Sequence, residues 1–322
     1  MFTISKKSRI ILLGLGLLIS TLSNAQTYPN KTIKMVIGYP PGAATDLFGR
    51  AIAKNLQEIT GQSVVVENKV GAAGTVAAEA IVRSNPDGYT ILNSASQITI
   101  NPFVQKLSFN TEKDLIPVIQ TLSVSYVLIT GPKFSVHSLS DLVEYAKKNP
   151  SKVNYGSYGN GSGPHLSMAM LEKLAGIEMQ HIQYRGSPQL LTALLAGEID
   201  VAFDTTTSIL ALVQAGKIKP LAIGGTKQSD LFPTVPTIAK SYPGFDSDGW
   251  QGFFVTAGTP TEIVKKLNAD INKAMNSNEL KALADARGVR IISGSSEQFS
   301  LFFKQELKKY EQVIRENNIK MD

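Results

Sequence analysis

The stretch Ile37-Gly38-Tyr39-Pro40-Pro41-Gly42-Ala43-Ala44-Thr45-Asp46 joins an apolar run, residues 33–37, to a helical pattern over residues 47–56. Two prolines and a glycine force a turn, and the small residues after them place no bulk over the first helical turn. The first N–H groups of a helix have no internal partner, and together with the helix dipole they form an anion site. The alternative is a plain helix start, capped by Thr45 or Asp46.

Strand and helix patterns alternate along most of the chain. The expected strands cover residues 32–39, 63–67, 89–93, 126–130, 153–157, 179–183, 201–204, 219–224 and 249–255, with a short one near 289–291, and the expected helices cover residues 45–60, 75–84, 139–148, 164–174, 188–196, 208–215, 260–275, 278–287 and 296–317. This alternation predicts an α/β fold with parallel sheets covered by helices on both faces.

The alternation also predicts how the chain divides into domains. It restarts at Tyr126 and ends at Gly224, while the C-terminal helices need a sheet to cover. We therefore predict a discontinuous first domain, residues 26–124 and 225–322, and a second domain, residues 125–224. The chain would cross between them near Thr121–Ser125 and Gly224–Asp230. Ligands of such sheets bind beyond the carboxyl ends of the strands, so a ligand is expected in the interdomain cleft.

The N-terminal residues resemble a secretory signal peptide. A basic segment at residues 6–9 precedes an apolar run at residues 10–19 and small residues at 23–25. The apolar run is shorter than the ~20 residues that a membrane-spanning helix needs. We therefore predict a signal peptide over residues 1–25 and a periplasmic, secreted protein. The chain has no cysteine, which excludes disulfides and thiol chemistry.

Composition argues against several other functions. The net charge of +6 falls to +3 without residues 1–25, which carry three positive charges and no negative ones. No basic cluster with interleaved aromatics indicates nucleic-acid binding. The three histidines lack metal-ligand spacing, so neither a metal nor a cofactor is expected. Without a Gly-x-Ser-x-Gly or Walker motif we expect no enzyme, and the remaining catalytic alternative is an exported hydrolase using Ser162 and His165.

Five strand ends lead into helix starts rich in small and hydroxyl-bearing residues. Besides the opening stretch, these are residues 70–75, 155–165, 184–188 and 203–208. We expect Ser162 or Gly163 to cap one helix and Ser187 to cap another. Together these corners offer many N–H and O–H donors, which suits a carboxylate ligand. Arg185 either adds a bidentate carboxylate contact or is an exposed structural arginine.

Eight short motifs follow one another along the chain. They are Tyr28-Pro29-Asn30-Lys31, Pro40-Pro41-Gly42-Ala43-Ala44-Thr45-Asp46, Val65-Val66-Glu67-Asn68-Lys69, Asn85-Pro86-Asp87-Gly88-Tyr89-Thr90, Gly159-Asn160-Gly161-Ser162 with His165-Leu166, Tyr184-Arg185-Gly186, Pro233-Thr234-Val235-Pro236-Thr237 and Trp250-Gln251-Gly252. In this order they resemble the Bug proteins, also called the TctC family, which are extracytoplasmic solute receptors of tripartite tricarboxylate transporters.

The resemblance implies a two-domain fold like that of type II periplasmic binding proteins, with a small carboxylate in the cleft. Together with Arg185, the predicted substrate-binding residues are Tyr39, Ala43, Ala44, Thr45, Asp46, Gly74, Thr75, Ser96, Gly159, Ser162, His165 and Asp204. Asp46 is expected in the first helical turn, since a carboxylate facing an anion would repel it. Ala43 stands where the family usually has a second glycine, and Gly163-Pro164 replaces hydroxyl-bearing residues.

The resemblance also implies partners. We expect a monomer that delivers its ligand to membrane transporter subunits like TctA and TctB, without nucleic acid, metal or cofactor. The alternative is a subunit that presents its ligand to a membrane sensor kinase. The sequence leaves the carboxylate itself open among mono-, di- and tricarboxylates, aromatic acids and amino acids.

Overall fold

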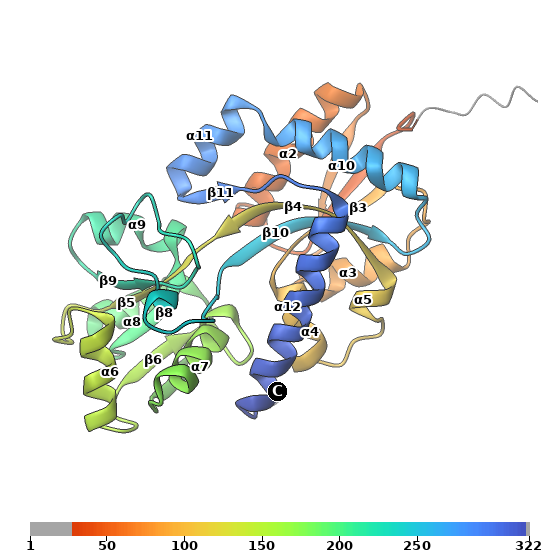
Figure 1. The fold of residues 1–322 in the computed structure, drawn as a ribbon. Coiled ribbons are helices and arrows are strands. Elements are labelled where there is room, and N and C mark those ends of the chain that lie inside the picture. The colour runs from red at the N-terminus through yellow and green to blue at the C-terminus, as the bar shows by residue number, and fades with distance from the viewer. Residues whose placement is uncertain (1–27, 320–322) are drawn as a thin grey trace, which may run out of the picture.

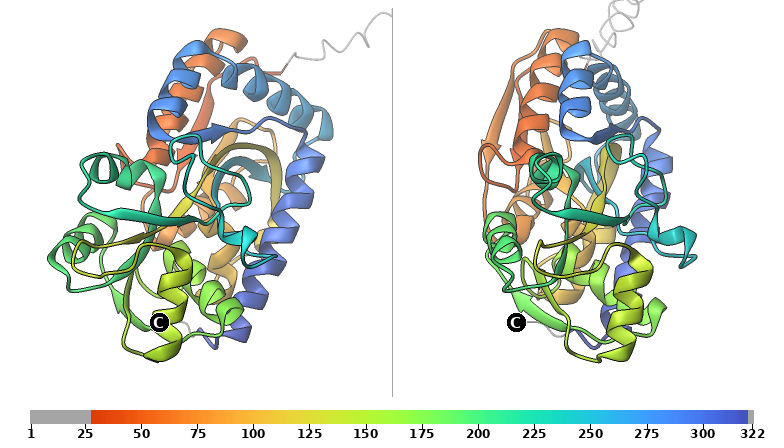
Figure 2. Two further views of the ribbon diagram at one scale, coloured as in Figure 1. Left: turned by 60° about the vertical axis from the view of Figure 1, so that its left-hand side comes forward. Right: turned by 90° about the vertical axis from the view of Figure 1, so that its left-hand side faces the viewer.

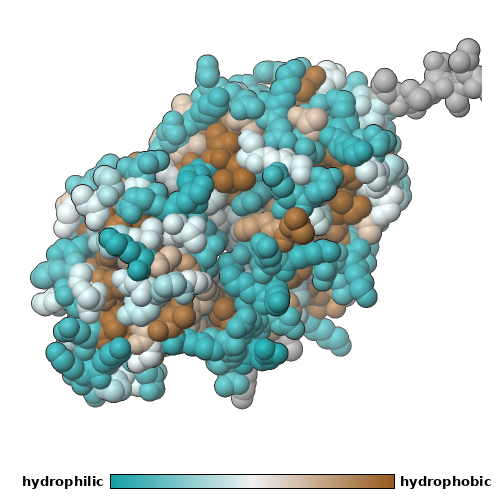
Figure 3. All heavy atoms as spheres, viewed as in Figure 1, coloured by the Kyte–Doolittle hydropathy of each residue, from teal (hydrophilic) through white to brown (hydrophobic). Residues whose placement is uncertain are grey.

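A computed structural model describes residues 28–319, so the predicted signal peptide and its cleavage after Ala25 lie outside the described residues. The described chain folds into two α/β lobes, each built on its own sheet (Figure 1). Hydrophilic residues cover most of the face shown in Figure 3 on both lobes.

The first lobe contains the larger sheet. Within residues 28–319 its strands are β1 (Ile33–Ile37), β2 (Val64–Asn68), β3 (Thr90–Ala95), β4 (Leu115–Val124), β10 (Gly249–Thr256) and β11 (Val289–Ile291), in the order β11-β4-β10-β3-β1-β2. β1 pairs in parallel with β2 and β3, but β10 is antiparallel to both β3 and β4. The predicted all-parallel sheet is therefore wrong. β4 leads out to the second lobe and β10 returns from it, so these neighbours run in opposite directions.

Helices cover both faces of this sheet. They are α2 (Ala44–Thr60), α3 (Thr75–Val82) after the 3₁₀ turn η1 (Ala72–Gly74), α4 (Gln97–Val104), α5 (Thr111–Asp114), α10 (Thr261–Met275), α11 (Asn278–Arg287) and α12 (Ser296–Glu316). Because successive strand residues point to opposite faces, Met35 packs with α2 and α10, while Val36 packs with α3 and α12. The sequence analysis missed α4, α5 and β4.

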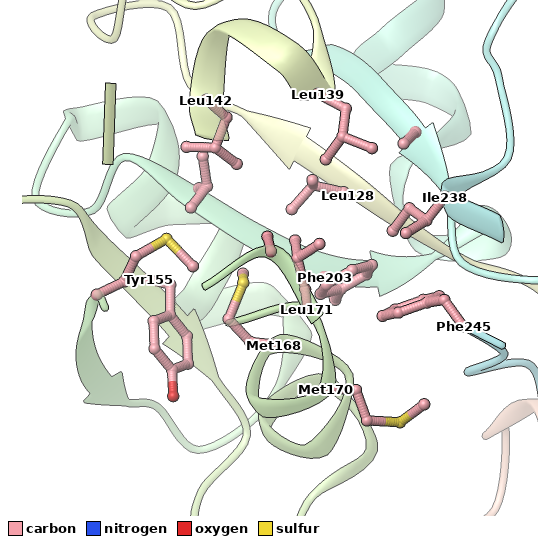
Figure 4. Close-up of a cluster of buried hydrophobic side chains, with 14 of the residues drawn as sticks. Leu128, Leu139, Leu142, Tyr155, Met168, Met170, Leu171, Phe203, Ile238 and Phe245 are labelled. Carbon is pink, nitrogen blue, oxygen red and sulfur yellow. The ribbon is translucent and has the colours of Figure 1, made fainter. Parts of the chain in front are cut away.

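The second lobe contains the smaller sheet. Its described strands are β5 (Tyr126–Thr130), β6 (Asn154–Ser157), β7 (Gln180–Gln183), β8 (Val201–Thr205) and β9 (Lys219–Ile223), in the order β7-β6-β8-β5-β9, and its helices are α6 (Leu139–Lys148), α7 (Gly163–Ala175), α8 (Ser187–Ala196) and α9 (Thr206–Gln214). β6 is parallel to β7 and β8, whereas β5 is antiparallel to β8 and β9. Figure 4 shows Leu128, Leu142 and Phe203 in the core beside this sheet.

The chain returns to the first lobe later than predicted. Phe232, Ile238 in the 3₁₀ turn η2 (Ile238–Lys240), and Phe245 are buried in the hydrophobic cores of the second lobe, and Gly249 is the first residue to rejoin the larger sheet. The predicted crossing near Gly224–Asp230 is therefore too early. We propose that the domains comprise residues 28–124 with 249–319, and residues 125–248.

Helix α12 links the cores of the two lobes. Phe299 and Phe303, in its N-terminal half, are buried with β10 of the first lobe. Tyr310 and Ile314, nearer its end, are buried in the core of the second lobe. Figure 2 shows this helix running alongside both lobes.

Glu172 on α7 provides a test of packing in the second lobe. Burial raises the pKa of this carboxyl to about 7, although its Oε1 accepts a hydrogen bond of 2.6 Å from the Met179 N–H. The folded state therefore binds this proton more tightly than the unfolded state, so stability falls as the pH rises from 4.5 to 7, with the full penalty above 7. We expect Glu172→Gln to be about 1–2 kcal/mol more stable than the parent above pH 7, allowing for partial exposure, and equal below pH 4.5.

Calorimetric melting on both sides of this pH window measures the difference. Glu144→Gln, at an exposed position on α6 of the same lobe, removes the same charge and should leave the pH dependence almost unchanged. A constant stability difference between Glu172→Gln and the parent across the window would contradict the assignment.

Candidate functional site

A cavity of about 270 Å³ lies between the lobes, where α2 and α9 begin. We call it the cleft cavity; it is lined by Gly42, Ala44, Leu122, Val124, Thr205, Thr207, Ser208, Trp250, Gln251, Arg287 and Val289. α9 and the residue before it belong to the second lobe, and the other lining residues belong to the first. The ligand is predicted to bind between the two domains, and this cavity lies there.

The start of α2 is held by Asp46. The Asp46 carboxylate accepts hydrogen bonds from the Gly42 N–H at 2.9 Å, from the Asn68 amide at 2.8 Å and from Arg50 Nε at 3.0 Å. Burial alone would raise the pKa of Asp46, but these bonds from Arg50, Asn68 and Gly42 outweigh it and lower the pKa. The Asp46 carboxylate therefore stabilises the turn before α2, as expected for a residue in the first helical turn. Its predicted contact with the ligand gains no support.

With Asp46 occupied in this way, the corner presents bare backbone to the cavity. Ala43 precedes the helix as its cap residue, and no side chain caps the helix. Ala43 donates its own N–H to the Pro40 carbonyl at 3.1 Å. The amides of Ala44 and its neighbours open the helix and have no partner within it, and Ala44 itself lines the cavity. That an anion binds at this corner, residues 37–46, stays a prediction.

The corner before α3 lies against the corner after β1. A Cβ atom on Gly38 would lie 2.8 Å from the Cα of Gly74, so the two backbones touch. Thr75 follows, and its hydroxyl oxygen accepts hydrogen bonds from Asn101 at 3.0 Å and Gln105 at 2.8 Å. Gly74 and Thr75 do not line the cleft cavity, and a direct ligand contact from Thr75 stays a prediction.

Tyr39 and Ser162 bring buried hydroxyls without a hydrogen-bond partner among the described residues. Burial, with a smaller contribution from Tyr126, raises the pKa of Tyr39, so its hydroxyl remains a proton donor. Ser162 precedes α7 as its cap residue but makes no capping bond. A Cβ on the neighbouring Gly163 would lie 2.4 Å from the Tyr126 hydroxyl. Neither Tyr39 nor Ser162 lines the cleft cavity, so a ligand contact from either hydroxyl stays a prediction.

The loop that carries Ser162 also contacts the first lobe. A Cβ on Gly161 would lie 2.7 Å from Val104 of α4, and Gln97 donates to the Gly161 carbonyl at 3.4 Å. Gly161 in turn donates its N–H to His165 Nδ1 at 3.1 Å. His165 therefore holds the loop from within α7.

Asp204 lies on β8, next to its last residue. Its carboxylate accepts hydrogen bonds from the Tyr158 hydroxyl at 2.5 Å, the Ser187 hydroxyl at 2.6 Å and the Thr205 N–H at 2.7 Å. Burial raises the pKa of Asp204 despite these bonds. Ser187 thus binds Asp204 instead of capping α8, whose cap residue is Gly186, so the predicted serine cap is wrong. Asp204 itself does not line the cavity, whereas Thr205 does.

The remaining predicted residues lie outside the cavity wall. The Ser96 N–H donates to the Trp250 carbonyl, the Thr45 carbonyl accepts from Asn93, and Gly159 bonds Ser157. Arg185 is exposed, and its N–H donates to Gln189, in line with the structural alternative.

Residues that sequence reasoning did not assign to the site also line the cavity. They are Gly42, Leu122, Val124, Thr205, Thr207, Ser208, Trp250, Gln251, Arg287 and Val289. Thr207 and Ser208 belong to a strand end that the sequence marked, and Gln251 belongs to a motif. The sequence around Arg287 does not indicate a binding residue, because only the contact between the end of α11 and the start of α9 brings Arg287 to the cavity.

The hydrolase alternative gains no support. The Ser162 hydroxyl has no partner in the described chain, so it is not paired with His165. A different pair forms, in which Ser157 Oγ lies 2.6 Å from His181 Nε2, but Ser157 is fully buried and cannot meet a substrate. Residues 28–319 contain no group of three or more His, Cys, Asp or Glu that could hold a metal ion.

Two α/β lobes with a small cavity between them are typical of a solute-binding protein. The chain belongs to the TctC family, the tripartite tricarboxylate transporter family receptor, which matches residues 48–319. The resemblance seen in the motifs is therefore confirmed. The prediction that the protein is no enzyme agrees with this family of receptors.

Relatives support the same assignment. The protein BugT of Bordetella pertussis is 31% identical over 97% of this chain and 98% of its own. Two solved structures have the same two-lobed fold. R. palustris Rpa4515 with adipate has a TM-score of 0.79 and 28% identity, covering 92% of this chain and all of that one. MatC from Rhodopseudomonas palustris with bound malate has a TM-score of 0.73 and 26% identity, covering 89% of this chain and all of that one.

None of the helices in residues 28–319 has the length and apolar character to cross a bilayer.

Proposed function

We propose that this protein is an exported periplasmic receptor that captures a small carboxylate in the cleft cavity. It then delivers the ligand to membrane subunits of a tripartite tricarboxylate-type transporter. The observation that carries the proposal is the meeting of two helix N-termini, those of α2 and α9, at one cavity of about 270 Å³. Helix N-termini favour anions through their free N–H groups and their dipole.

The chemistry of the cavity wall supports an anionic ligand. No aspartate or glutamate lines the cavity, and Arg287 contributes a positive charge. The carboxylates of Asp46 and Asp204 are bound to their own partners beneath the surface. The adipate and malate bound by the two structural relatives are of the same chemical class as the proposed ligand.

Calorimetry against mono-, di- and tricarboxylates, aromatic acids and acidic amino acids tests capture. Uptake of the tightest ligand into vesicles that contain the transporter subunits tests delivery, with and without the receptor. Binding with receptor-dependent uptake is the expected result. Binding without uptake, together with activation of a sensor kinase, would favour the ligand-presenting alternative, and no binding by any acid would contradict capture.

Tyr39→Phe separates a ligand-binding hydroxyl from a merely buried one. In the unliganded protein this hydroxyl is buried without a partner, so removing it should raise stability by about 1 kcal/mol. If the hydroxyl donates to the ligand carboxylate, binding should weaken by roughly tenfold or more. Thermal melting should show that the unliganded protein is more stable than the parent. Calorimetry should show that it binds the ligand more weakly.

Ser162→Ala is the matching change in the other lobe and should behave in the same way. A Tyr39→Phe protein that binds every acid as tightly as the parent would exclude Tyr39 from the site.

A further inference from the structure

Arg287 is the one charged residue among those that line the cleft cavity. It is the last residue of α11, and its carbonyl oxygen accepts a hydrogen bond of 2.9 Å from the Thr207 hydroxyl of α9. That bond joins the two lobes at the cavity wall. The Arg287 guanidinium makes no ion pair or hydrogen bond with any residue in the range 28–319. A positive charge is therefore present in the cleft without a counter-charge from the protein.

The start of α9 adds donors beside Arg287. The Thr206 N–H donates to the Ser125 carbonyl at 3.1 Å. The N–H groups of Thr207 and Ser208, also in the first turn, have no acceptor within the helix. Both of these residues line the cavity. This group of donors is separate from the start of α2, which comes from the other lobe. The cavity thus has two places that favour an anion.

Gln251 gives an independent indication that a polar ligand occupies this space. Its side chain lines the cavity and is only 8% exposed. Its Oε1 has no hydrogen-bond partner among the described residues. Buried amide oxygens in folded proteins are almost always paired, so an unpaired one beside the cavity marks a position for a donor group of the ligand, such as a hydroxyl or an ammonium group, and the carboxylates must be bound elsewhere in the cavity.

Resting on the proposed function, we infer that Arg287, together with the first turn of α9, binds a second carboxylate of the ligand. Arg287 is then the residue that makes the receptor select dicarboxylates over monocarboxylates. The start of α2 holds the first carboxylate, and the guanidinium supplies the planar pair of donors that a second carboxylate fits. The cavity volume of about 270 Å³ accommodates a short chain between the two ends.

The test compares matched acids by calorimetry. The probes are succinate, glutarate and adipate, each paired with the monocarboxylate of the same chain length, namely butanoate, pentanoate and hexanoate. The parent protein should bind the preferred dicarboxylate roughly tenfold to a hundredfold more tightly than its monocarboxylate partner. Arg287→Gln should remove this preference by weakening binding of the dicarboxylate much more than binding of the monocarboxylate. Arg287→Lys should restore part of it, since the charge returns without the planar fork.

Two features keep the variants interpretable. Thr207 bonds the backbone of Arg287, so this bond between the lobes does not depend on the side chain that is replaced. Arg315→Gln removes the same charge from an exposed position on α12 and should leave every affinity unchanged. Unchanged dicarboxylate preference in Arg287→Gln would overturn the inference while leaving carboxylate capture intact. A parent protein that binds none of the acids would instead contradict the proposed function.

Discussion

Replacing Ala44 with aspartate should abolish binding of the carboxylate ligand. Ala44 lines the cleft cavity at the first position of α2, so the new carboxylate would stand beside the proposed anion. Two like charges about 4 Å apart at an effective dielectric constant of about 20 repel by about 4 kcal/mol. That repulsion corresponds to a roughly thousandfold loss of affinity, which calorimetry with the tightest acid would measure.

Ala44→Asn separates charge from bulk, because asparagine has almost the same shape as aspartate without the charge. We expect Ala44→Asn to weaken binding far less than Ala44→Asp. Neither change should lower the melting temperature of the unliganded protein, since an acidic residue in the first turn interacts favourably with the helix dipole. Equal binding by Ala44→Asp and the parent would mean that the start of α2 is only a turn.

Asp46→Ala should disrupt the same corner from inside the fold. The change leaves the Gly42 N–H and the Asn68 amide without the carboxylate they bond. Because Gly42 is exposed and Asn68 is half-buried, each lost hydrogen bond to the carboxylate costs about 1 kcal/mol, and the ion pair with the partly exposed Arg50 adds little because solvent screens it. We expect the free energy of unfolding to fall by about 2 kcal/mol. Ligand affinity should fall as well, because Gly42 lines the cavity.

Arg50→Gln is the control, since it removes the half-exposed ion pair and keeps the buried carboxylate with its two amide donors. Its loss of stability should be below about 1 kcal/mol. Because the folded-state pKa of Asp46 lies below 3.8, its contribution is present above that pH and is lost as the pH falls through the folded pKa. Equal urea unfolding curves for Asp46→Ala and Arg50→Gln would contradict this role.

Local signals explain which parts of the fold could be predicted. After β1, β6 and β8, a few neighbouring residues are typical of a turn followed by a helix start. The predicted starts of α2, α7 and α9 therefore lie within two residues of the observed ones. β4 was missed because Leu115–Val124 contains Pro117 and Gln120 and follows no such corner. Its pairing with β10, far along the chain, makes it a strand, and no local pattern reports that pairing.

The same distinction applies to the site. Ala44 was predicted as a binding residue because the prolines and glycine before it indicate a helix start with free N–H groups. It lines the cavity. Asp46 was included among the contacts; its hydrogen bond from Gly42 is local, but the one from Asn68 depends on a fold that brings β2 beside the corner. Arg287 could not be predicted, because long-range contacts, the pairing of β11 with β4 and the bond from Thr207, place the end of α11 at the start of α9.

The central claim is that a small carboxylate lies in the cleft cavity with one charged end at the start of α2. A crystal structure of the protein with the tightest acid from the calorimetric panel tests it most directly. The account predicts a carboxylate within hydrogen-bond distance of the amides at Ala44 and Thr45, inside the space that α9 closes from the other lobe. An acid bound outside this cavity, or bound with its apolar part against Ala44 and its carboxylates in solvent, would contradict it.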